Sequence, residues 1–167
     1  GLYIVSRNHG LMYFNINTQK TRILDPLNDQ SEVLYRDMEG NIWYDHLNFL
    51  VKYNPDRNQI NRIKHPVPHP LPVINAGNKL TYITRYSNQL IVASDYGHVY
   101  SFNPDINKFR LIYKNPSHPV RTLVVKDNKL LIAVYGLGVL VMNENFHIMD
   151  TIQQEKPWDG IFFYSIM

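Results

Sequence analysis

The sequence has no cysteine, no long hydrophobic run and no cluster of like charge, and each absence excludes a class of protein. Without cysteine, the 167 residues hold no disulfide framework and no thiolate metal site or nucleophile. The longest apolar stretch, 130–142, is interrupted by Gly136 and Gly138 and is shorter than the roughly 18–20 residues of a membrane helix. We therefore expect no membrane span in this segment.

Basic residues are present but dispersed. The 17 lysines and arginines occur in ones and twos and give a formal net charge of +3. Nucleic-acid binders instead collect such residues on one face to neutralise phosphates. No nucleic-acid partner is expected for this segment.

Helical periodicity is also missing, while apolar residues are plentiful. No segment combines a sustained 3.6-residue period with capping residues. Apolar residues make up 44% of the chain, which is normal for a globular domain with a substantial core. The sequence therefore predicts an all-β fold.

An internal repeat is the strongest pattern in the chain. An apolar or aromatic residue followed by asparagine recurs at Asn15, Asn54, Asn103 and Asn143, with spacings of 39, 49 and 40 residues. A period of about 40 residues is typical of four-stranded propeller blades. The long middle interval is explained by the proline-rich stretch 65–72, whose prolines lack amide donors and cannot join a strand ladder.

Each period contains four expected strands separated by turn residues. In each period, two strands precede the asparagine and form a hairpin. The first strands cover 2–5, 41–44, 90–93 and 130–134, and the matching second strands cover 11–14, 49–53, 99–102 and 139–142. The following outer strands cover 21–24, 59–63, 108–113 and 146–152, and the preceding strands cover 32–36, 81–86, 121–126 and 160–166. Four antiparallel strands per period complete a blade.

The predicted fold is thus a single β-propeller segment of about four four-stranded antiparallel blades. The blades cover approximately 1–30, 31–79 with the loop 65–72, 80–119 and 120–157, and 158–167 is the first strand of a further blade or closes a ring. We expect a fragment of a larger, seven-bladed propeller, and a closed four-blade ring is the alternative.

The segment 34–43, with Asp37, Gly40, Asn41 and Trp43, and the following 49–55 carry a family resemblance. They resemble the two-component regulator propeller repeat, which is written loosely Asp-x-x-Gly-Asn-Ile-Trp, a turn, and an aromatic–Asn pair; Asp45-His46 replaces its usual Gly-Thr. The resemblance implies a periplasmic sensor region of a hybrid histidine kinase that responds to oligosaccharides, with the kinase outside this segment.

From the residues themselves, the motif is structural. Asp37 and Asn41 are expected to bond the turn backbone, Gly40 to adopt positive φ, and Trp43 to pack between blades. A hairpin turn does not supply the burial that tunes a catalytic carboxylate, so neither Asp37 nor Glu39 is expected to be catalytic.

No metal or cofactor site is expected. His65 and His69 have the i, i+4 spacing of helical metal ligands, but the prolines between them exclude the helix, and an exposed loop is expected. The other histidines are expected in solvated turns: His9, His46, His98, His118 and His147.

The turns that join the second and third strands should lie on one face of the propeller and are the candidate ligand surface. An aromatic and hydrogen-bonding mixture suits sugars, and ordinary hairpin tips are the alternative interpretation. The candidate residues are Arg7, Asp45, His46, Asp95, Tyr96 and Tyr135.

Three functions remain, in order of preference. The first is a non-enzymatic sensor with an oligosaccharide ligand, and the second is a protein-interaction scaffold. The third is a fragment of a propeller glycoside hydrolase or lyase, which would need two facing carboxylates. Open terminal blades also make a homodimer an expected partner.

Overall fold

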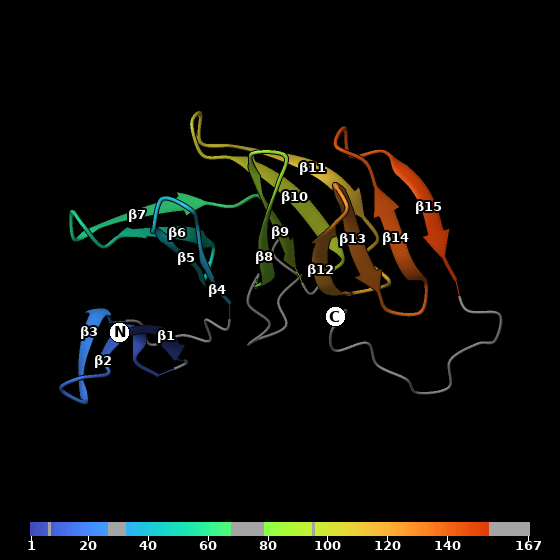
Figure 1. The fold of residues 1–167 in the computed structure, drawn as a ribbon. Coiled ribbons are helices and arrows are strands. Elements are labelled where there is room, and N and C mark those ends of the chain that lie inside the picture. The colour runs from blue at the N-terminus through green and yellow to red at the C-terminus, as the bar shows by residue number, and fades with distance from the viewer. Residues whose placement is uncertain (7, 27–32, 68–78, 95, 154–167) are drawn as a thin grey trace. The chain divides into compact units, whose positions relative to one another are not determined.

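In the computed structural model, which describes residues 1–6, 8–26, 33–67, 79–94 and 96–153, every regular element is a β-strand (Figure 1). No helix in these ranges is long and apolar enough to cross a membrane. The strands are β1 (Leu2–Ser6), β2 (Gly10–Asn15), β3 (Lys20–Asp25), β4 (Leu34–Arg36), β5 (Ile42–His46), β6 (Phe49–Asn54), β7 (Gln59–Lys64), β8 (Leu80–Tyr86), β9 (Gln89–Ser94), β10 (His98–Asn103), β11 (Lys108–Lys114), β12 (Val120–Lys126), β13 (Lys129–Val134), β14 (Gly138–Met142) and β15 (Ile148–Ile152).

The chain forms two compact units, Gly1–Lys79 and Leu80–Met167. The first unit contains the sheets β1-β2-β3 and β4-β5-β6-β7, and the second contains β8 to β11 and β12 to β15, each in antiparallel up-and-down order. The predicted strand order is confirmed wherever the structure describes it, with bounds shifted by at most two residues. The predicted strand 160–166 and the loop residues 68–72 lie outside the described residues, and the blade boundaries remain predictions.

The four repeated asparagines close equivalent turns, which explains the period in the sequence. The side-chain Oδ1 accepts a backbone N–H at 3.0 Å from Asn17 to Asn15, 2.9 Å from Arg57 to Asn54, 2.9 Å from Asp105 to Asn103 and 3.0 Å from Asn145 to Asn143. Bonds of this kind stabilise a turn locally and favour asparagine there.

One residue in each of these turns has a left-handed backbone. The positions are Gln19, Asn58, Asn107 and Phe146. Phe146 had been predicted to start the outer strand, but it lies in the turn, and β15 begins at Ile148. Its buried ring belongs to the core.

In the first unit, an apolar core and a buried polar group join the two sheets. Leu11 packs with residues of β5 and β6, among them Ile42 and Val51. The hydroxyl of Tyr44 donates to Asp25 Oδ2 at 2.5 Å, and Arg62 Nη2 lies 2.6 and 2.8 Å from the two Asp25 oxygens. Burial, followed by the bond to Asp25, raises the pKa of Tyr44 far above its usual range, so the hydroxyl remains a donor.

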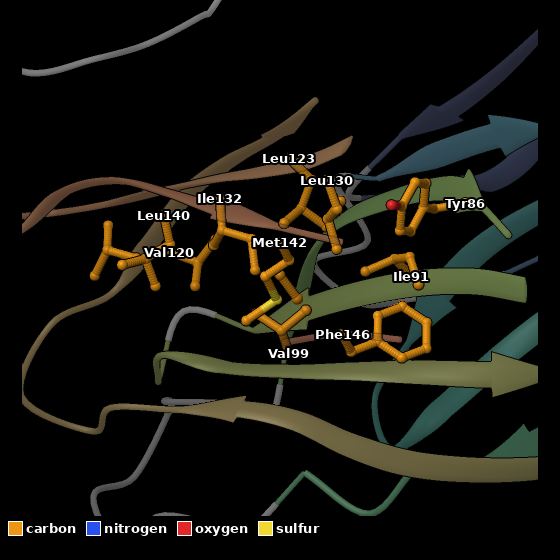
Figure 2. Close-up of a cluster of buried hydrophobic side chains, with 12 residues drawn as sticks. Tyr86, Ile91, Val99, Val120, Leu123, Leu130, Ile132, Leu140, Met142 and Phe146 are labelled. Carbon is orange, nitrogen blue, oxygen red and sulfur yellow. The ribbon is translucent and has the colours of Figure 1, made fainter. Parts of the chain in front are cut away.

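The second unit has the larger apolar cluster, which joins its two sheets (Figure 2). Ile91 and Val99 pack with Ile132, Leu140 and Met142 of the other sheet. One polar bond reinforces this packing, since the Tyr86 hydroxyl donates to the Asn128 carbonyl at 2.8 Å. The packing of the two sheets against each other therefore holds the turns at their ends in position.

Candidate binding surface at the hairpin turns

The predicted ligand residues divide between the two units. Asp45 and His46 belong to the first, and Tyr96 and Tyr135 belong to the second. Arg7 and Asp95 lie outside the described residues. Each unit is therefore considered separately.

The motif at Asp37 is a buried network of hydrogen bonds. Asp37 Oδ1 accepts from the Asn41 amide at 2.8 Å, while Oδ2 accepts from Asn41 Nδ2 at 2.9 Å and from Trp43 Nε1 at 2.7 Å. Gly40 has a φ of 83°, in the left-handed region that the turn requires. Burial by itself raises the pKa of Asp37, but the bonds from Trp43 and Asn41 and the charge of Lys52 outweigh it and lower the pKa. The carboxylate is thus held ionised in a structural position.

The structure corrects the predicted position of Asp45. Asp45 lies within β5, opposite Leu50, and is only 2% exposed, while His46 ends the strand half-buried. The turn is limited to Leu47 and Asn48, because Leu47 adopts a φ of 54° and closes the hairpin tightly. Strand alternation then places Asp45 on the same face as Trp43.

His65 was predicted to be exposed, and this is wrong, because its side chain is buried with 3% of the residue exposed. Its backbone amide donates to the Asn48 carbonyl at 3.0 Å, which brings the ring to the hairpin turn. Nε2 lies 3.2 Å from the Leu47 carbonyl and 3.6 Å from Asp45 Oδ1. The described residues hold no group of three or more potential metal ligands, and His69 lies outside them.

His98 was likewise predicted in a solvated turn but lies buried in β10, stacked on Tyr100 with ring centroids 6.2 Å apart. Burial lowers the pKa of His98, Lys114 lowers it further, and a hydrogen bond to the Tyr96 backbone opposes both. The side chain is therefore a neutral core residue at neutral pH.

In the second unit, two turns and one connection meet at the same end of the sheets (Figure 1). Asn115 donates its amide to the Gly97 carbonyl at 2.9 Å, and a Cβ on Gly97 would lie 1.9 Å from the Asn115 carbonyl oxygen. A Cβ on Gly136 would lie 3.2 Å from the His118 ring. Tyr96 and Tyr135, the neighbours of these glycines, therefore flank the same connection, 115–119.

Tyr135 is the more accessible of the two tyrosines, with 43% of the residue exposed. The guanidinium carbon of Arg121 lies 5.2 Å from the centre of its ring, a cation–π distance. Burial raises the pKa of Tyr82, and the positive charge of Arg121 partly offsets this rise. Arg121 is one basic residue in a strand, and no sequence pattern selects it; the glycines in the turns were the available signal.

Comparisons with known proteins find similarity in structure alone. No family model and no curated protein matches the sequence. The extracellular domain of BT4673 from B. thetaiotaomicron matches 97% of this chain and 23% of its own at a TM-score of 0.73 and 13% identity. That protein is named as a candidate one-component system and, in a second structure, as a candidate hybrid two-component system.

Two further solved structures are similar. The extracellular domain of BT3049, a candidate hybrid two-component system from B. thetaiotaomicron, matches 98% of this chain and 21% of its own at a TM-score of 0.66 and 18% identity. YCF48 from Cyanidioschyzon merolae matches 83% of this chain and 51% of its own at a TM-score of 0.57 and 10% identity. The chain thus spans less than a quarter of the two-component chains. The all-β propeller fold implied by the motif is confirmed, and the chain is similar to the extracellular domains of two-component systems.

Proposed function

We propose that this chain is part of the extracytoplasmic, periplasmic sensor region of a hybrid two-component signalling protein, with a histidine kinase elsewhere in the parent protein. The observation that carries this proposal is the likeness of nearly the whole chain to the extracellular domains of BT4673 and BT3049. The segment itself would bind a ligand without transforming it.

The ligand class we propose is an oligosaccharide. The turn end of the second unit supports it, because Tyr96 and Tyr135 flank one connection and Tyr135 presents an accessible aromatic ring. An aromatic ring offers an apolar face to the C–H groups of a sugar, and its hydroxyl offers a hydrogen bond. Propeller blades commonly place such loops around a binding face.

A thermal-shift screen of the intact parent ectodomain against plant and host oligosaccharides tests this function. A ligand that binds the folded state raises its stability by mass action, so a saturable rise in Tm is expected. Tyr96→Ala and Tyr135→Ala should each reduce it. Ile106→Ala is the matched control, since Ile106 is an exposed residue of the β10–β11 turn at the other end of the sheets.

Three results would count against the proposal. If no sugar shifts Tm, the oligosaccharide class is wrong. If both tyrosine variants show the same shift in Tm as the wild type, the binding site does not include these tyrosines. Cleavage of the sugar, measured by product analysis, would make the segment catalytic and favour a hydrolase or lyase.

A protein-interaction scaffold is the second candidate, and one observation favours it. Three apolar side chains of the outer strand β15 are exposed: Ile148, Met149 and Ile152. Exposed apolar groups on a sheet edge are suited to a protein partner.

A further inference from the structure

Charged residues are unevenly distributed between the two ends of the sheets in the second unit. In an antiparallel up-and-down sheet, successive turns alternate between the two ends. The acidic residues of the described turns, Asp105, Asp127 and Glu144, all lie in turns at the end opposite to Tyr96 and Tyr135. The end with the tyrosines instead carries His118 and Arg121.

Arg121 has an unusual environment for a cation. Within the described residues its buried Nε atom has no hydrogen-bond partner, and its guanidinium carbon lies 5.2 Å from the centre of the Tyr135 ring. A buried N–H of a charged group without an acceptor costs free energy, and a negative charge held by the accessible part of the same guanidinium offsets some of that cost. The site is therefore favourable for an incoming negative group.

His118 lies in the connection that leads into β12, three residues before Arg121. Its Nδ1 lies 3.2 Å from Asn115 Oδ1, which fixes the ring, and the ring packs against Gly136. When Nδ1 donates to Asn115, Nε2 is left to accept a hydrogen bond from a hydroxyl group. The surface thus offers a cation, an acceptor and an aromatic ring together.

We propose that Arg121, His118 and Tyr135 form an acidic-sugar site that binds the carboxylate of a hexuronic acid residue. The planar guanidinium of Arg121 matches a planar carboxylate with two parallel hydrogen bonds. Arg121 covers part of the Tyr135 ring, and the exposed part of that ring receives the pyranose. This inference rests on the proposed function and specifies its ligand.

The test uses sugars in matched pairs with the intact parent ectodomain. Each oligosaccharide of a uronate panel, including trigalacturonate, is titrated by calorimetry beside its carboxyl-reduced neutral counterpart. The acid should bind about 10–100-fold more tightly than its neutral partner, which is the effect of one hydrogen-bonded charge. The preference should weaken as salt is raised, since the site is partly exposed.

Arg121→Gln should remove the preference for the acid over its neutral partner, because the charge-dependent contact is lost. Arg121→Lys should restore part of it, since the charge is kept and the planar fork is lost. Arg110→Gln is the matched control: Arg110 also lies over an aromatic ring, that of Phe146 at 5.9 Å, in the same unit. The Arg110→Gln variant should keep the preference for the acid over its neutral partner.

The outcomes separate this inference from the proposed function. If neutral sugars bind in a Tyr135-dependent way and acids bind no better, the acidic-sugar site is wrong and the oligosaccharide sensor stands. An acid preference that survives Arg121→Gln also overturns the site. If no sugar of either kind binds, both proposals fail. Unfolding curves of each variant show whether a loss of binding is a loss of folding.

Discussion

Asp37 illustrates how one buried carboxylate organises a hairpin. Three donors on Asn41 and Trp43 converge on its two oxygens. Asp37→Asn replaces one carboxylate oxygen by an NH2 group, which cannot accept a hydrogen bond, so at least one of the bonds from Asn41 and Trp43 is lost, and we expect a loss of about 1–3 kcal/mol in the free energy of unfolding at neutral pH. Urea unfolding measures it.

The lowered pKa of Asp37 also fixes a pH dependence. Because the folded pKa lies below the unfolded value of about 3.9, the carboxylate stabilises the protein above that pH, and this contribution disappears as pH falls through the folded pKa. Asp37→Asn should therefore lose less stability than the wild type between pH 5 and pH 2. Parallel acid titrations of the two proteins would contradict the assignment.

For His98 the stabilising form is the neutral one, whereas for Asp37 it is the charged one. Its folded pKa is lowered, so its neutral form stabilises the protein fully above the unfolded pKa of about 6.5, and stability falls as pH drops through the folded pKa. We expect His98→Gln to flatten the decline in Tm below pH 6.5. His147→Gln, at an exposed turn histidine, is the control that should keep the decline. An NMR titration of the His98 ring measures the pKa directly.

At the scale of elements, the turns depend on glycine to different degrees. A Cβ on Gly97 would lie 1.9 Å from a backbone oxygen of Asn115, whereas the nearest atom to one on Gly40 is a flexible Arg36 nitrogen at 3.8 Å. Both glycines have positive φ. Gly40→Ala should cost about 1–2 kcal/mol from backbone strain alone, and Gly97→Ala about 3 kcal/mol or more, because the connection must move.

Thermal unfolding of the two glycine variants checks this order. Gly97→Ala should also weaken sugar binding, since its turn supports Tyr96. Equal losses of stability in the two variants would contradict the close approach of the 115–119 connection.

The strands and most turns were predictable because their causes are local. Alternating or continuous apolar runs specify strands, and the asparagine side chains close their own turns. Asp45 and His65 were misplaced because their burial depends on tertiary events: a left-handed Leu47 extends β5, and a bond to Asn48 folds His65 back onto the hairpin. Sequence patterns report neither event.

The candidate site was predictable only in part, for the same reason. Tyr96 and Tyr135 were selected as equivalent turn positions, and the glycine contacts with the 115–119 connection bring both to one end of the second unit. Arg121 was not selected, because its value comes from the ring beside it and from a buried Nε. A contact of this kind, between a strand residue and a turn residue that follows later in the chain, cannot be predicted from sequence patterns.

At the scale of the whole molecule, the outer strands differ in a way that bears on association. β3, β7 and β11 carry lysine or arginine, which discourages edge-to-edge pairing, whereas β15 has no basic residue. In the described residues β15 pairs only with β14. Its apolar side chains Ile148, Met149 and Ile152 are exposed. This edge is where we expect two copies of the protein to associate.

Met149→Lys should weaken that association, because it places a charge on the edge that other strands already protect with basic residues. Sedimentation velocity across a concentration series should show the dimer of the wild type shifting to monomer in the variant. Met38→Lys is the matched control, with the same change at an exposed methionine outside any strand, 85% exposed against 65% for Met149. If both variants dissociate alike, net charge governs association and the β15 edge does not; a wild type that is monomeric throughout would remove the edge as an interface.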